Sequence, residues 1–396
     1  MNFKLIIIIN FFLALLSGNY LYPQDGINKV LKGIESNNKL IKSGADYVNA
    51  KKMEFRTGLT PYDPEVSFDY LFGTPKELGN RSEFMINFTF DFPTIYGKKS
   101  FLSDLKSENI IYESTALKQK ILLEAKLICI ELIYLNKREI ELKTRLNDAE
   151  QLYEFFKIKL EKGEGNMIDV NKAKLQMMNA LSDFELNESE RIKSLNKLND
   201  LNGGIPVIFA DAEYPTQPQL PVLAEIEKRM ETADPELISL DYRLKISKQE
   251  IEINKDLRLP KLSFGYRYES LLSEKFNGFH VGITLPFWEN NNIVKTKELE
   301  SVYALSQIDA YKTHLKFETK ELFEKNEILR KILIQNKEDL STLNNIELLK
   351  KSLLFGEISS IDYLMELTYY YSIKDKIDLL EKEFYEVQAK LYKFEL

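Results

Sequence analysis

The sequence has few of the residues from which most active sites and metal centres are built. It contains one cysteine and two histidines among 396 residues, and its 54 lysines and arginines are outnumbered by 61 aspartates and glutamates. A single cysteine excludes an intrachain disulfide, and two histidines are too few for a histidine metal site or a proton relay. The net charge of −7, without any lysine- or arginine-rich run, argues against nucleic-acid binding.

The few candidates for chemistry have simpler explanations. Cys129 falls in a helical stretch, where we expect a buried free thiol. His280 alternates onto the polar side of a strand and His314 lies on a helix, so we expect both to be structural or solvated. Gly203-Gly204 is followed by no lysine and hydroxyl at the spacing of a phosphate loop. We therefore assign no catalytic, cofactor-binding or metal-binding residue and expect no enzyme.

Long apolar runs are absent beyond the N-terminus. Residues 1–22 have the pattern of a secretory signal peptide, because Lys4 gives a positive start and residues 5–16 form an apolar run. The run is short for a membrane helix, and a single N-terminal anchor is the alternative. If the protein crosses a membrane elsewhere, it does so with strands.

Two pairs of alternating segments predict strands. The first pair covers residues 64–72 and 84–92, and the second covers 261–268 and 279–287. Successive side chains of a strand point to opposite sides, and here one side is apolar and largely aromatic while the other is polar or small. The apolar side includes Phe68, Phe88, Phe264 and Ile283, and the polar side includes Ser67, Thr89, Ser263 and Thr284.

Strands of about nine residues can cross a bilayer at a tilt. We therefore expect the apolar side to face lipid and the polar side to face a water-filled pore. The alternative is the core of a soluble sandwich. We favour the membrane because the pattern occurs twice, beside very long helices and after a signal peptide.

Proline and glycine are absent from residues 98–160 and 293–354, which predicts two unusually long helices. Apolar residues recur at steps of three and four along the first and on a seven-residue grid along the second, so each must pack lengthwise on other helices. Turns containing Gly163 and Gly356 follow, with returning helices at 167–201 and 359–394.

The order of elements occurs twice along the chain. A first repeat (23–205) and a second repeat (225–396) flank a proline-rich linker (206–224), and each contains an opening helix, two strands, a long helix, a turn and a returning helix. The opening helices are expected at about 28–56 and 226–255. Pro64 and Pro260 begin the two strand pairs 196 positions apart, and each turn glycine is followed six residues later by an aspartate.

Four strands are too few to close a membrane barrel, since the smallest such barrels have about eight. An open strand edge in lipid would leave backbone groups without hydrogen bonds. Several chains must therefore share one barrel.

This repeated order resembles the TolC family of outer-membrane efflux proteins over essentially the whole mature chain, although no single motif is specific. The resemblance implies a mainly α protein with a membrane β-barrel part: a homotrimer with a twelve-stranded barrel in outer-membrane lipid and a coiled-coil tunnel in the periplasm. It also implies docking to a periplasmic adaptor protein and an inner-membrane pump.

The function implied is a passive exit duct of a tripartite efflux or type I secretion system. The alternative is a periplasmic coiled-coil scaffold without a membrane barrel. An autonomous porin is disfavoured, because a simple pore does not need the helices. The exported substrate and the pump class are not encoded in any recognisable motif.

The resemblance identifies the two turns as a periplasmic gate, formed by Gly163, Asp169, Gly356 and Asp362. It implies that Asp169 pairs with an arginine and a tyrosine of the neighbouring coil. Those positions are Ile358 and Leu353 here, so the polar lock is absent in that form.

Asp362 matches an acid that rings the closed lumen in the family, whereas a second acid three residues later is Met365 here. On the residues alone, both aspartates are equally well explained as acids stabilised at helix N-termini.

Overall fold

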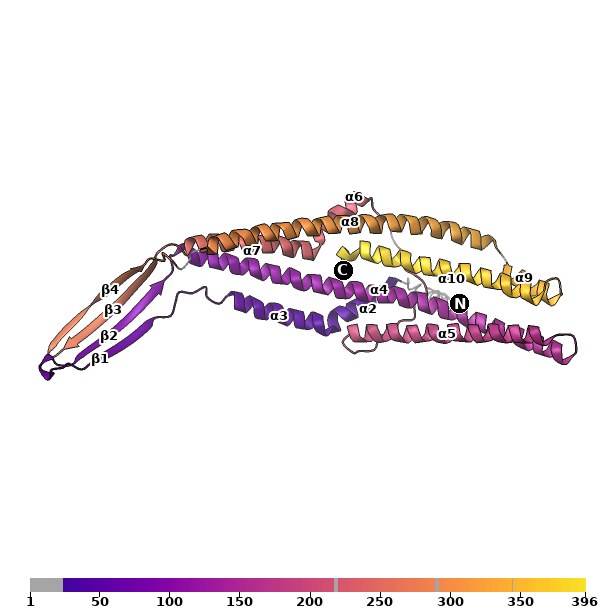
Figure 1. The fold of residues 1–396 in the computed structure, drawn as a ribbon, viewed down its shortest axis with the longest axis horizontal. Coiled ribbons are helices and arrows are strands. Elements are labelled where there is room, and N and C mark those ends of the chain that lie inside the picture. The colour runs from indigo at the N-terminus through magenta and orange to yellow at the C-terminus, as the bar shows by residue number, and fades with distance from the viewer. Residues whose placement is uncertain (1–23, 217–219, 289–291, 344) are drawn as a thin grey trace, which may run out of the picture. The chain divides into compact units, whose positions relative to one another are not determined.

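The computed structural model describes residues 24–216, 220–288, 292–343 and 345–396, so the predicted signal peptide lies outside the described part. The chain is mainly helical with one four-stranded antiparallel sheet, which confirms this part of the expected fold class (Figure 1). Its residues divide into two compact units. Of the described residues, the helical unit contains 24–39, 119–216, 220–226, 319–343 and 345–396, and the sheet unit contains 40–118, 227–288 and 292–318.

None of the helices in the described ranges combines the length and the hydropathy needed to span a membrane.

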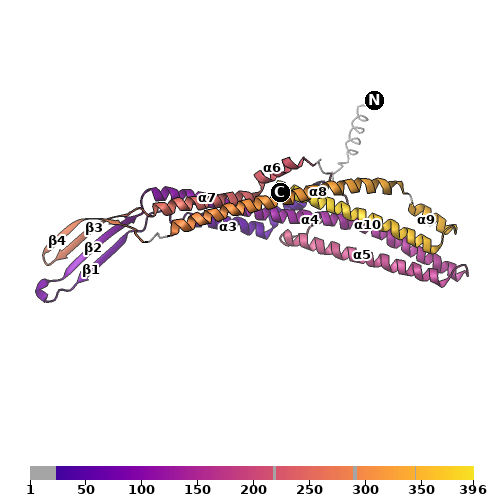
Figure 2. The ribbon, with the colours of Figure 1, turned by 45° about the horizontal axis from the view of Figure 1, so that its top comes forward.

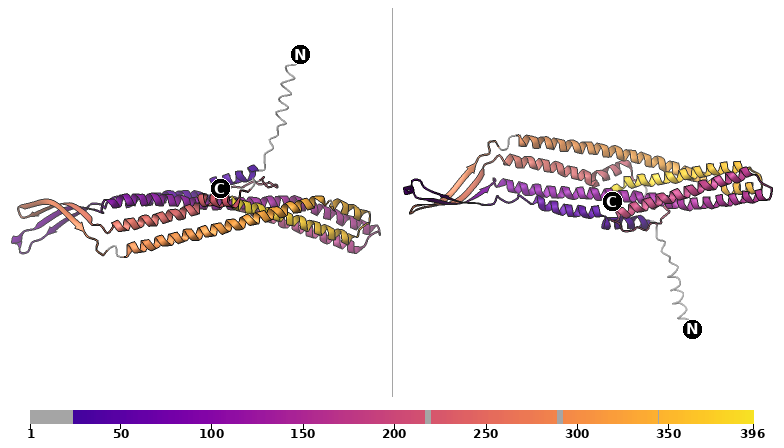
Figure 3. Two further views of the ribbon diagram at one scale, coloured as in Figure 1. Left: turned by 90° about the horizontal axis from the view of Figure 1, so that it is seen from above. Right: turned by 60° about the horizontal axis from the view of Figure 1, so that its bottom comes forward.

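The sheet belongs to the sheet unit. Its strands are β1 (Glu65–Leu71), β2 (Arg81–Phe90), β3 (Lys261–Leu271) and β4 (Glu274–Thr284), paired in the order β1-β2-β3-β4. The first hairpin has a longer connection that includes η1 (Lys76–Leu78), whereas Leu272 and Ser273 alone connect β3 to β4. No helix of the sheet unit lies over either side of the sheet (Figures 1, 2 and 3).

The strand boundaries predicted from alternation were partly wrong. β2 begins at Arg81 rather than residue 84, and β4 begins at Glu274 rather than residue 279. Charged residues near the turns break the alternation of apolar and polar side chains, but their backbones remain paired. β2 ends before Asp91, whose buried side chain forms an ion pair with Lys99 at 3.0 Å.

The helices and helix segments of the sheet unit run along one another. They are α3 (Lys39–Phe55), α6 (Leu223–Ala233), α7 (Pro235–Asp256), the start of α4 (Thr94–Glu161) and the start of α8 (Ile293–Thr342). Lys98 contacts Asp256 at 2.9 Å and Lys106 contacts Glu250 at 3.2 Å, which joins α4 to α7. Lys297 of α8 reaches the same Glu250 at 2.9 Å.

Each opening helix is broken where one helix was expected. α2 (Gln24–Asn37) ends before Asn38, whose side chain donates to the Leu201 carbonyl at 2.7 Å. α6 ends before Asp234-Pro235, where the aspartate caps α7 and proline takes its first position. The two breaks lie 196 residues apart, the spacing of Pro64 and Pro260, but the repeat itself stays a prediction.

The second long helix, expected at 293–354, is also interrupted. α8 ends at Thr342 and α9 (Asn345–Leu354) begins three residues later. The hydroxyls of Ser341 and Thr342 donate to the carbonyls of Glu338 and Asp339, at 2.7 Å each. Such local side-chain bonds compete with the backbone bonds that would continue the helix. A prediction based on the absence of glycine and proline does not take them into account.

The helical unit contains the rest: α2, most of α4, the end of α8, α9, α5 (Met167–Leu201), α10 (Ser360–Leu391) and η2 (Lys393–Glu395). Within it, α10 lies beside α4 over much of its length (Figures 1 and 2). Its core is aliphatic, with Leu132, Ile133, Leu142 and Leu198 almost fully buried.

The break before α7 provides a first test. The Asp234 carboxylate accepts from the amides of Glu236 and Leu237, at 2.9 and 3.1 Å, and from the Tyr311 hydroxyl. We expect Asp234→Ala to lower the free energy of unfolding by about 1–2 kcal/mol, because several donors lose their acceptor. Urea denaturation of the purified protein measures this change.

The exposed Asp241, on the same helix, is the matched control. Asp241→Ala should change the stability by less than about 0.5 kcal/mol. Equal midpoints for the two variants would contradict a capping role for Asp234.

Candidate functional site

The two turns of the long helices have the same backbone geometry. Gly163 and Gly356 adopt left-handed conformations, with φ of +75° and +73°, which glycine tolerates at no steric cost. The next amide in each turn reaches back five residues, Glu164 to Lys159 and Glu357 to Ser352, at 2.9 Å in both cases. This is a Schellman ending, which satisfies the last carbonyls of α4 and α9.

Both aspartates named from the sequence lie in helix caps. Asn166 accepts from the Asp169 amide at 2.9 Å and donates to the Asp169 carboxylate at 2.7 Å. Ser359 accepts from the Asp362 amide at 3.2 Å and donates to the Asp362 carboxylate at 2.7 Å. At each helix start the capping side chain therefore accepts from the amide of the third helical residue and donates to the carboxylate of that same residue. Asp362 is exposed, whereas Asp169 is partly buried.

A second contact joins the two turns. The hydroxyl of Ser360, a buried residue at the start of α10, donates to the carboxylate of Asp169 at the start of α5. No partner for Asp169 was predicted from the sequence, and Ser360 was not recognised as one. The available signal was the pair Ser359-Ser360, in which one hydroxyl caps its own helix and the next is free to reach across.

An apolar cluster packs beneath this contact. Its buried members are Phe156, Val170, Ala173, Leu353, Tyr363 and Leu367, contributed by α4, α5, α9 and α10. Ile358 is partly buried and packs against the same cluster. Leu353 and Ile358, the two positions where polar partners of Asp169 were expected, are therefore part of an apolar core.

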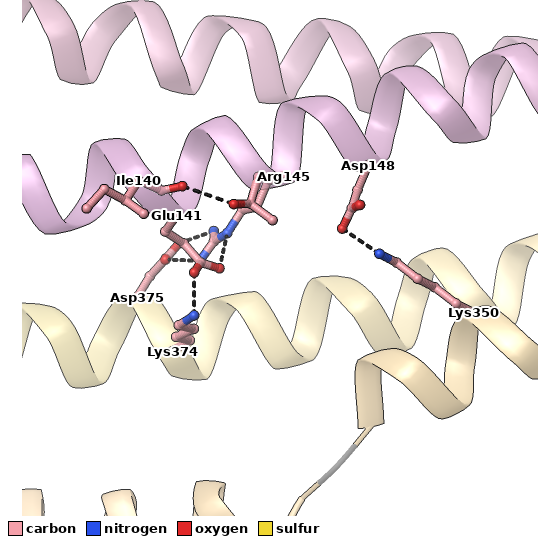
Figure 4. A network of polar contacts seen from close by, with 8 residues as sticks. Ile140, Glu141, Arg145, Asp148, Lys350, Lys374 and Asp375 are labelled. Carbon is pink, nitrogen blue, oxygen red and sulfur yellow. Dashed lines mark hydrogen bonds and ion pairs between the residues drawn. The ribbon is translucent and has the colours of Figure 1, made fainter.

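Farther along α4 and α10, ion pairs link the two helices (Figure 4). The buried Arg145 makes two hydrogen bonds to Asp375, at 3.1 and 2.6 Å, and its guanidinium lies 4.0 Å from the centre of the Tyr371 ring. It also contacts Glu141 at 3.1 Å, and Glu141 accepts from Lys374. A paired, stacked guanidinium of this kind fixes one register of the helices.

The same row continues to Glu381, which is 8 % exposed. Its carboxylate contacts Lys137 of α4 at 2.6 Å and also binds Lys337 of α8, so it links three helices. Burial alone would raise the pKa of Glu381, but hydrogen bonds from the two lysines outweigh burial and hold this pKa below its usual value. The pKa of Glu141 is lowered against burial in the same way by Lys374 and Arg145.

The sheet has two chemically distinct sides. Phe88 lies directly opposite Phe264, and Ile283 lies opposite Leu262 on the same side. Phe68 shares this side through its pairing with Phe84. The exposed fractions of Phe68, Phe88, Phe264 and Ile283 are 66, 42, 49 and 63 %. The other side includes Ser67, Thr89, Ser263 and Thr284. The assignment of these sides to lipid and to a pore stays a prediction.

The polar side contains a charge network that was not predicted from the sequence, because the second strand was expected to begin only at residue 84. Glu83 and Glu269 face each other across β2 and β3. Arg81 contacts Glu269 at 3.0 Å from one side, and Arg267 contacts Glu83 at 2.6 Å from the other. Like charges directly opposite are destabilising in a sheet, so the arginines make this pairing acceptable.

The remaining candidates for chemistry are isolated. Cys129 is fully buried, and burial raises the pKa of its thiol to about 12. His280 and His314 are both exposed on separate elements. Within the described ranges, no group of three acidic, histidine or cysteine residues could hold a metal ion.

Solved structures resemble this chain over almost its whole length. The outer membrane protein VceC of Vibrio cholerae aligns with a TM-score of 0.75 and 12 % identity, covering 92 % of this chain and 94 % of that one. The CmeC outer membrane channel of Campylobacter jejuni gives 0.72 and 15 %, covering 93 % and 85 %. The MtrE outer membrane channel of Neisseria gonorrhoeae gives 0.61 and 15 %, covering 93 % and 88 %.

This chain shares the fold of these outer-membrane proteins. No protein-family model matches the sequence, and neither does any curated protein. The likeness therefore lies in three-dimensional arrangement rather than in residues.

Acid should weaken the helical unit of this chain. Glu141 and Glu381 have a lowered pKa when folded, so their stabilising contribution is present above their unfolded pKa. It is lost as the pH falls through the lowered folded pKa. We expect the urea midpoint to stay constant near neutral pH and to fall progressively below about pH 5.

In Glu381→Gln, the midpoint should be lower at neutral pH and should fall less on acidification. The exposed Glu164, replaced by glutamine, serves as the control and should leave the profile unchanged. Identical profiles for Glu381→Gln and the unaltered protein would refute this origin of acid sensitivity.

Proposed function

We propose that this protein is the outer-membrane exit duct of a tripartite efflux or type I secretion system. The observation that carries the proposal is the sheet, whose apolar side is exposed and whose outer strands β1 and β4 each have one edge unpaired within the described chain. In water such a surface would aggregate. In a bilayer it can contact lipid, provided that the edges are closed by other copies.

The helices support assembly from identical chains. One side of α10 exposes apolar residues at every fourth position, with exposed fractions of 57, 47, 63 and 50 % for Ile361, Met365, Tyr369 and Ile373. A stripe with this period fits the side of another helix. Three chains would supply twelve strands, which lies within the range of membrane barrels. We infer a homotrimer in the outer membrane, with its helices in the periplasm.

A passive duct needs an energy source elsewhere. We propose that an inner-membrane pump supplies this energy and that a periplasmic adaptor protein connects the pump to the duct. The ends of the helical hairpins support this docking. Met167 and Ile168 on one turn, and Leu354 and Phe355 on the other, are 58, 65, 62 and 79 % exposed. Exposed apolar tips of this kind are suited to a partner protein.

Substitutions on the two sides of β2 test the barrel. Phe88→Arg should reduce membrane insertion, at a cost of about 2–4 kcal/mol if the residue lies near the bilayer midplane. Thr89→Arg, the neighbouring residue on the polar side, should insert normally. Heat-modifiable mobility of the protein extracted from outer membranes measures the inserted fraction.

Equal insertion of the two variants would contradict the barrel. Extraction of the unaltered protein without detergent would instead favour the periplasmic scaffold.

We further propose that the turns form the closed gate and that apolar packing with one hydrogen bond holds it. The apolar cluster containing Leu353 and Val170 keeps the starts of α5 and α10 together, and Ser360 and Asp169 fix their register. A gate of this kind is opened by separating two helices. It requires no broken ion pair at the tip.

Asp169→Ala and Ser360→Ala should each raise the resting conductance of the channel in planar bilayers. Because both remove the same hydrogen bond, the double variant should conduct little more than either single variant. Additive increases would show that the two residues act separately.

Asp362→Ala is the matched control, since it removes the equivalent hydrogen bond from the Ser359 hydroxyl to a carboxylate on α10 without touching the contact between turns. It should leave the resting conductance unchanged. If three copies of Asp362 form an acidic ring, this variant should also weaken block by multivalent cations. Unaltered block would leave Asp362 as a helix cap only.

A further inference from the structure

A cavity of about 290 Å³ lies in the helical unit, away from the turns. It is bordered by α2, α4, α10 and the segment around Pro215. Its volume is at the lower end of the range for small-molecule sites. This cavity has no part in the proposed channel or gate.

One wall contains an acceptor without a donor. Gln388 of α10 is only 5 % exposed, and its side-chain carbonyl oxygen receives no hydrogen bond within the described part of the chain. Buried amide oxygens nearly always accept a hydrogen bond. An amide oxygen that lines a cavity and accepts none therefore indicates a missing donor.

Another wall contains a cation, Lys126, whose electrostatic partner among the lining residues is the exposed Glu395. Lys126 of α4 is partly buried and forms no hydrogen bond or ion pair with any described residue. Burial lowers the pKa of its ammonium group, and only the exposed Glu395 opposes this. An anionic group in the cavity would restore the interaction that burial removes.

Apart from the exposed Asn28, the remaining side chains of the lining are apolar or aromatic, and several are buried. Ile27 and Ile130 are 5 and 3 % exposed. Tyr385 is stacked on Tyr214, with ring centres 4.2 Å apart and planes 10° from parallel. An apolar or aromatic group of a ligand could pack against these side chains without moving them.

We propose that this cavity binds a small apolar α-amino acid. Its carboxylate would be held by Lys126, its ammonium group would donate to Gln388, with Glu395 at the rim, and its side chain would lie against Tyr385 and Ile130. A simple anion would leave Gln388 unpaired, and a simple amine would leave Lys126 unpaired. A zwitterion satisfies both, and this site is independent of the function proposed for the turns and the sheet.

Calorimetric titration of the detergent-purified full-length protein tests the site with three probes. L-Phenylalanine carries both charges, 3-phenylpropanoate lacks the ammonium group, and 2-phenylethylamine lacks the carboxylate. L-Phenylalanine should bind once per chain, about tenfold more tightly than either analogue. No binding of L-phenylalanine, or equal binding of all three compounds, overturns the proposal.

Two variants assign the contacts. Lys126→Met should remove the preference over 2-phenylethylamine, and Gln388→Met should remove the preference over 3-phenylpropanoate. Lys174→Met, which alters an exposed lysine of α5, is the control and should bind as the unaltered protein does. Unchanged preferences in both variants overturn the proposal.

Thermal unfolding gives an independent readout. Gln388→Met removes the unpaired acceptor, so its midpoint without ligand should exceed that of the unaltered protein. L-Phenylalanine should raise the midpoint of the unaltered protein and leave that of Lys126→Met unchanged. If Gln388→Met fails to fold, Lys126→Met and the three probes still decide the matter.

Discussion

Backbone hydrogen bonding along the edges of the sheet is the constraint on which the rest of the structure depends. β1 and β4 each have one neighbour within the described chain, so their outer amides and carbonyls need partners elsewhere. Other copies can supply these partners, and a lipid-facing sheet then has no open edge. The exposed stripe along α10 makes the same demand of the helices. Both features lead to the proposed oligomer by separate routes.

The sequence predicted the kinds of element and the sides of the strands well, because both depend on local periodicity. Phe88 and Phe264 could be assigned to one side of a sheet from alternation alone, and the structure pairs them directly. The end of β2 nearest the turn could not be predicted, because Arg81 and Glu83 are paired through ion pairs across strands. The breaks at Asn38 and Thr342 were missed because side-chain hydrogen bonds, rather than glycine or proline, mark those helix ends: Asn38 bonds to the distant Leu201 carbonyl, and Thr342 bonds to the nearby Asp339 carbonyl.

At the turns, the sequence predicted the glycines and the two acids but not what Asp169 contacts. Ser360 lies 191 residues away, and no local pattern connects it to Asp169. Leu353 and Ile358 stand where polar partners of Asp169 were expected, so the sequence suggested only that these hydrogen bonds and ion pairs were lost. The structure instead shows that these two side chains join an apolar cluster. The partner of an acid on one hairpin depends on tertiary packing, which periodicity cannot encode.

The two hairpins of the sheet differ in a way that matters for labelling the protein. The β3–β4 connection has only two residues, one of them, Leu272, at a positive φ of 54°. An inserted peptide there would disturb the strand register on both sides. The β1–β2 connection is longer and has its own short helix, so it can accept an epitope or a fluorophore site with little change to the pairing. One chemically addressable position per chain would make subunits countable by single-molecule photobleaching.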